Sequence, residues 1–169
     1  MTHATFAEPR QASLPRLDAP LATGSPAARM DLYVSIHKAL RSFMTDTLSR
    51  IGRIDVLDRA DRDAALAQLD ELLGLCLAHL RHENDFVHTA IGALQAEADA
   101  LRTAIGADAE RLALRLYRHL ALFVAENFQH MHIEETVHNA LLWQYYSDAE
   151  LGALHGRLMA SIAPSSASL

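Results

Sequence analysis

Proline is absent from the whole interval between positions 27 and 163, and all five prolines of the chain lie outside it. A proline inside a helix costs about 3 kcal/mol, so a long interval without one leaves helices free to form along most of the chain. Alanine and leucine, both strong helix formers, dominate the same interval, whereas the β-branched residue valine is rare. The sequence therefore predicts an all-α fold.

The positions of the five prolines indicate how the 169 residues are organised. Four of them fall within residues 1–28, among many small side chains, which is typical of a disordered N-terminal leader. A chain of this length most often forms one domain. We therefore expect a single helical bundle over residues 29–163, followed by a short tail at 164–169.

Composition excludes several classes of function. The formal net charge is −6, from 15 basic and 21 acidic residues, and the basic residues form no stripe that could neutralise nucleic-acid phosphates. No apolar run approaches the 18 residues of a membrane-spanning helix. A single cysteine excludes an intramolecular disulfide framework, and the first residues do not resemble a secretion signal. We expect a cytoplasmic protein that binds neither nucleic acid nor membranes.

The spacing of apolar residues predicts five helices, approximately at 27–51, 58–92, 94–105, 108–146 and 147–162. The third is too short to run back along its neighbours if the second and fourth are parallel, at about 1.5 Å per residue. Two explanations remain open: a segment near Gly92–Leu94 is missing from the sequence, or two chains exchange helices in a homodimer. We favour the first explanation.

Two segments repeat one pattern, in which a histidine precedes a glutamate by four residues: His79 with Glu83, and His130 with Glu134. Four residues along a helix correspond to a rotation of only about 40°, so both side chains point into the same volume. His37 places a third imidazole on the apolar face of the first helix. A buried carboxylate is normally paired or bound to metal. Three facing helices therefore predict a site for iron, manganese or zinc.

These motifs resemble the hemerythrin-like, His-His-Glu cation-binding family. The resemblance covers about residues 30–160 and is carried by three segments, 36–41, 79–87 and 130–138. It implies an up-and-down four-helix bundle, here with a short C-terminal helix, and a carboxylate-bridged non-haem di-iron centre. The metal ligands that it implies are His37, His79, Glu83, His130 and Glu134. Glu83 and Glu134 would be the bridging residues.

The chain departs from the family pattern at one place, because no histidine between His88 and His119 can supply the ligand that the family's third helix usually gives. Among the neighbouring side chains, Glu126 is a spare ligand candidate. We expect the side chain of Glu135 to point away from the metal site. It would then either accept a hydrogen bond from a metal-binding side chain or form a surface charge. Cys76 is interpreted as a small buried apolar residue.

Three kinds of function remain open on this reading. The first is a di-iron protein that binds or senses dioxygen, nitric oxide or iron. The second is a di-iron enzyme that reduces peroxide or nitric oxide, or that repairs iron centres. The third is a metal-free helical module that binds a protein partner. We rank binding first, because the sequence shows no nucleophile–base pair, nucleotide loop or flavin signature.

Overall fold

The computed structural model describes residues 29–79 and 85–162, without the side chains of 85–87 and 158–162. The expected leader and tail lie outside the described residues. The described elements are all helical, which confirms the prediction of an all-α fold. They are α1 (Val34–Gly52), α2 (Arg59–His79), α3 (Asp85–Thr103), α4 (Gly106–Ile133), the π-helical turn η1 (Glu134–His138), α5 (Asn139–Tyr145) and α6 (Asp148–Ile162).

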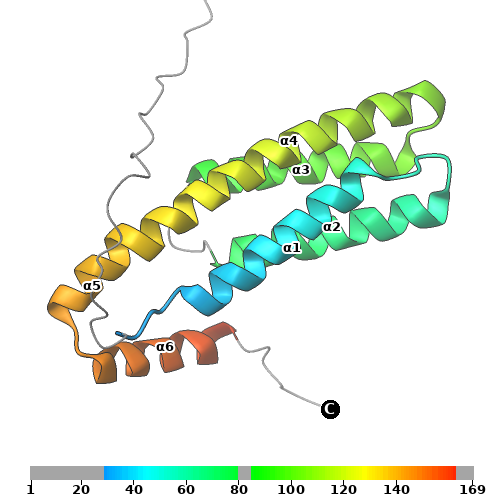
Figure 1. The fold of residues 1–169 in the computed structure, drawn as a ribbon. Coiled ribbons are helices and arrows are strands. Elements are labelled where there is room, and N and C mark those ends of the chain that lie inside the picture. Colours follow the sequence, from blue (N-terminus) through cyan, green and yellow to red (C-terminus); the bar gives the residue numbers. More distant parts are fainter. Residues whose placement is uncertain (1–28, 80–84, 163–169) are drawn as a thin grey trace, which may run out of the picture.

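Four long helices pack into a bundle in which successive helices run in opposite directions (Figure 1). α1 contacts α2, α2 contacts α3, α3 contacts α4, and α4 contacts α1, so the ring of helices is closed. The start of α1 and the ends of α2 and α4 therefore meet at one end of the bundle. Among the helices of the described ranges, none combines the length and apolar character needed to cross a lipid bilayer.

The boundary between the second and third helices differs from the prediction. α2 ends at His79 and α3 begins at Asp85, whereas the sequence pattern predicts one helix that continues to Gly92. Gly92 and Ala93 lie inside α3 and form no turn. With 19 residues, α3 matches α1 with 19 and α2 with 21, so neither a missing segment nor an exchanged helix is needed to close the bundle.

The core is formed by one leucine-rich face of each long helix. Leu69 and Leu73 of α2, Leu101 of α3 and Leu116 and Leu120 of α4 are all fully buried. Each buried group of this size contributes about 1.5–3 kcal/mol by leaving water. This packing fixes how the helices are rotated, and hence which side chains face the interior at the end of the bundle.

The C-terminal helix α6 turns back across the end of the bundle, beside the start of α1 (Figure 1). Arg29 holds this corner, because its guanidinium donates hydrogen bonds to the backbone oxygens of Trp143 and Tyr146, both at 2.6 Å, and to Asp148 at 3.0 Å. Leu151 of α6 is fully buried. α6 is thus tied to the same end of the molecule as the histidines of the two motifs.

Candidate metal site

The candidate site is built from three helix ends that the antiparallel order brings together. His37 lies in the first turn of α1, His79 is the last residue of α2, and His130 and Glu134 flank the junction of α4 and η1. Local helix signals and bundle topology therefore combine to gather these side chains.

Three of the side chains converge closely. One ligand atom each from His37, His79 and Glu134 lies within 4.8 Å of the other two. The Nε2 atom of His37 is 3.2 Å from Oε2 of Glu134, and Nε2 of His130 is 3.5 Å from the same oxygen. The rings of His37 and His79 meet edge to face, with centroids 5.2 Å apart. Of the five residues that the sequence indicates, four are thus brought together, and Glu83 lies outside the described residues.

The facing atoms of His37 and Glu134 have an unusual environment. His37 is completely buried and Glu134 is 5% exposed. Nε2 of His37 and Oε2 of Glu134 form no hydrogen bond within the described part of the chain. Two ligand atoms that each lie about 2.1 Å from one ion are roughly 3.0–3.4 Å apart in octahedral or tetrahedral geometry. The observed separation therefore fits a pair of ligands that share one cation.

The electrostatics of Glu134 point the same way. Burial alone raises the pKa of this carboxyl group, but the contact with His37 and the fields of His130, His37 and His79 lower it more. The net pKa lies below the ordinary value. Glu134 is therefore an ionised carboxylate in a nearly dry environment, surrounded by imidazoles, which is a donor set that suits a divalent cation.

On its other edge, the His37 ring contacts Glu135. The Nδ1 atom of His37 lies 3.1 Å from Oε1 of Glu135, and Arg41 donates to both oxygens of that carboxylate, at 2.5 and 2.9 Å. Of the two alternatives expected for Glu135, an acceptor or a surface charge, this geometry matches an acceptor for the imidazole of His37. The sequence analysis did not predict the contact between Arg41 and Glu135. The spacing of Arg41, one helical turn after His37, could have indicated it.

The π-helical turn is the second feature that the sequence pattern missed. The predicted helix 108–146 is continuous, whereas the structure places a π turn at Glu134–His138 between α4 and α5. Such turns occur frequently at functional sites. Here the turn contains both carboxylates that contact His37, and no apolar periodicity distinguishes it from the α-helix on either side.

The remaining predicted side chains lie away from this cluster. His88, His132 and His138 are exposed. Glu126 is also exposed, and it lines a pocket of about 210 Å³ between α3 and α4 rather than the metal site. Cys76 is buried in the apolar core, and burial raises the pKa of its thiol to about 12.

Another His–Glu contact links α3 and α4 at a separate place. Glu97 accepts from Nδ1 of His119 at 2.7 Å and lies 3.1 Å from Nε of Arg115. The cluster at the end of the bundle includes none of these three residues. This His–Glu–Arg row therefore resembles the one at His37 but has no second carboxylate beside its imidazole among the described contacts.

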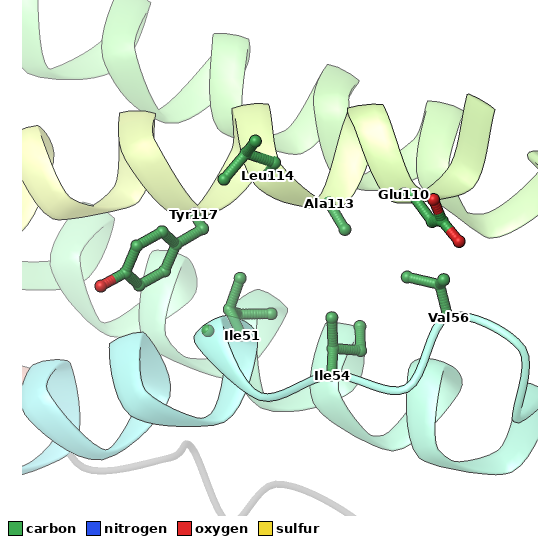
Figure 2. Close-up of a pocket in the computed structure, with 8 residues that line it drawn as sticks. Ile51, Ile54, Val56, Glu110, Ala113, Leu114 and Tyr117 are labelled. Carbon is green, nitrogen blue, oxygen red and sulfur yellow. The ribbon is translucent and has the colours of Figure 1, made fainter. Parts of the chain in front are cut away.

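A largely apolar pocket of about 250 Å³ lies toward the far end of α1 (Figure 2). Ile51, Ile54 and Val56 face Ala113 and Tyr117 of α4 across it. His37 precedes Ile51 by 14 residues, which corresponds to about 21 Å along α1. This pocket is therefore separate from the histidine cluster, and its lining offers only Glu110 as an ionisable carboxylate.

Comparison of the chain with models of known protein families and with curated protein sequences gave no match. The resemblance to the hemerythrin-like family thus rests on the motif residues quoted above.

Proposed function

We propose that this protein is a helical bundle of hemerythrin type that holds a non-haem di-iron centre and binds or senses dioxygen, nitric oxide or iron. The observation that carries the proposal is the buried contact between Nε2 of His37 and Oε2 of Glu134, at 3.2 Å, in which neither atom has a hydrogen-bond partner among the described residues. Three imidazoles and one ionised carboxylate, without a thiolate, form a donor set typical of iron, with zinc and manganese as alternatives.

The number of ions in the proposal comes from the sequence motif. The described donors would hold one ion, and the resemblance to the hemerythrin-like family implies that Glu83, four residues after His79, would help to hold a second. The side chain of His130 is 34% exposed, so the cluster borders the surface on that side. A metal position open to a small molecule distinguishes a working centre from a structural one. An open position on the metal is sufficient for a diatomic molecule to bind.

Metal content tests the proposal directly. We expect wild-type protein reconstituted anaerobically with Fe²⁺ to retain two irons per chain after desalting, and Glu83→Ala to retain fewer. His79→Ala and Glu134→Ala should lose iron, together with the rise in melting temperature that a ligand of the folded state produces. His132→Ala is the matched control, because this exposed histidine lies on α4 between His130 and Glu134.

Two results would contradict the proposal. Equal iron content in wild type, His79→Ala and Glu134→Ala would exclude these residues as ligands. A wild type that binds less than one ion per chain, and melts at the same temperature with and without a chelator, would favour the metal-free module. Catalytic loss of peroxide in the presence of a reductant would instead indicate the di-iron enzyme.

A further inference from the structure

The contacts behind His37 form a row that leads away from the candidate metal site. The guanidinium of Arg41 donates hydrogen bonds to both oxygens of Glu135, and Glu135 in turn contacts Nδ1 of His37. The exposed fraction falls along the row, from 32% for the Arg41 side chain to 24% for Glu135 and zero for His37. A bidentate pair of hydrogen bonds from an arginine restricts the orientation of a carboxylate as well as its position.

The imidazole of His37 is thus held between two consecutive residues of η1. Glu134 faces Nε2 and Glu135 faces Nδ1, at 3.2 and 3.1 Å. Arg41 donates to both oxygens of Glu135 and so keeps this carboxylate at the outer edge of the ring, whereas Oε2 of Glu134 has no hydrogen-bond partner in the described ranges 29–79 and 85–162. Two adjacent glutamates therefore have different surroundings and different tasks.

A neutral imidazole carries one N–H, and the hydrogen bond of one nitrogen decides which nitrogen keeps the lone pair. An acceptor at Nδ1 stabilises the form with hydrogen on Nδ1. The lone pair then lies on Nε2, which is the atom that faces Glu134. Carboxylates in this position orient a metal-binding histidine and make it a stronger donor.

We infer that Glu135 and Arg41 are positioning residues of the metal site: Glu135 fixes the tautomer and orientation of His37, and Arg41 fixes Glu135. This inference rests on the proposed metal-binding function. It extends the site by two residues that touch no ion, and it assigns Glu135 a role distinct from that of the neighbouring ligand Glu134.

The first test measures Zn²⁺ affinity by competition with a chromogenic chelator, since zinc accepts the same donors and does not change oxidation state. We expect Glu135→Leu and Arg41→Met to weaken Zn²⁺ binding about 10–100-fold. Glu135→Gln keeps an acceptor oxygen and should recover part of the loss. Arg115→Met is the matched control, because it breaks a similar His–Glu–Arg row away from the site and should leave affinity unchanged.

The second test reads the tautomer of His37 in the metal-free protein at pH 8.5, by two-dimensional NMR that correlates ring nitrogens with ring protons. We expect hydrogen on Nδ1 in wild type and in Arg115→Met, and a shift toward hydrogen on Nε2 in Glu135→Leu. A merely structural contact would not change this signal while the fold is retained.

The outcomes separate the two proposals. Wild-type protein that binds no Zn²⁺ would overturn the metal-binding function, and with it the role of the positioning residues. Wild type that binds Zn²⁺ through His37 and Glu134, with Glu135→Leu and Arg41→Met unchanged in affinity and tautomer, would overturn this inference and leave the metal site standing.

Discussion

Arg29 connects the N-terminal end of the described chain to the corner between α5 and α6, and its removal should release α6. Its guanidinium donates to the backbone oxygens of Trp143 and Tyr146, both at 2.6 Å. These oxygens lie at the C-terminal end of α5, where the helix itself supplies no partner for the last carbonyls. Arg29→Ala removes both contacts, and with them the bond to Asp148, which is exposed and adds little.

The size of the effect follows from these two bonds. A hydrogen bond that involves a charged group contributes about 1.5–3 kcal/mol when buried, and partial exposure reduces this to roughly 1 kcal/mol for each bond. Loss of both should therefore cost about 2 kcal/mol. This corresponds to an approximately 30-fold increase in the population of molecules in which α6 is detached.

Hydrogen–deuterium exchange measures this opening locally. We expect amides of α6 around Leu151 to lose about 30-fold in protection in Arg29→Ala, while amides in the middle of α2 keep theirs. Arg53→Ala is the matched control, because Arg53 also donates to a backbone oxygen, that of Ser49, but within α1. A change of less than threefold in α6 would refute the reasoning that the Arg29 contacts hold this helix.

The hydrogen bonds from Arg29 and from the backbone of Met30 hold the pKa of Asp148 below its ordinary value. A lowered pKa means that the ionised carboxylate favours the folded state at pH values above the ordinary pKa of aspartate, and that this contribution is lost as the pH falls through the lowered value. The Arg29–Asp148 contact is therefore fully present at pH 7, where the exchange experiment is carried out.

Three further predictions concern the core, the cysteine and the metal site. Leu69→Ala should lower the free energy of unfolding by about 2–5 kcal/mol in urea denaturation, whereas Leu75→Ala, on the same helix but 47% exposed, should change it by less than about 0.5 kcal/mol. Cys76, with a pKa of about 12, should react with a thiol reagent at pH 8 only when urea unfolds the protein; rapid labelling of the native chain would contradict its burial. Bound metal should fall between pH 7 and pH 5 in equilibrium dialysis, because protons compete with the metal for the imidazole nitrogens while Glu134, whose pKa is lowered, stays ionised; constant occupancy would argue against histidine ligands.

Much of the candidate site could be predicted because its residues obey a local rule. His130 and Glu134 are four residues apart on one helix, and this spacing alone places them on the same face. His37 stands out as the polar residue on an otherwise apolar face. That these side chains meet required only that the chain fold into an antiparallel bundle. Metal binding itself stays a prediction.

The errors arose where no local signal exists. Nothing in Leu80 to Asn84 is a glycine or a proline, and the apolar spacing continues through this segment, so periodicity could not place the end of α2 at His79. The π turn at Glu134–His138 has an ordinary helical composition. Both features depend on how the helices fit against one another.

Helix formation and the inward direction of the site histidines follow from the residues themselves. Proline-free, leucine-rich segments with regular apolar spacing form helices that bury their apolar face, and the site histidines lie on that face. Tertiary packing decided which partners those histidines obtained. Glu134 and Glu135 are equivalent in chemistry and adjacent in the chain, yet one faces the buried Nε2 of His37 and the other is held by Arg41. That difference arises because α1 packs beside η1, and neighbouring side chains on a helix point in different directions.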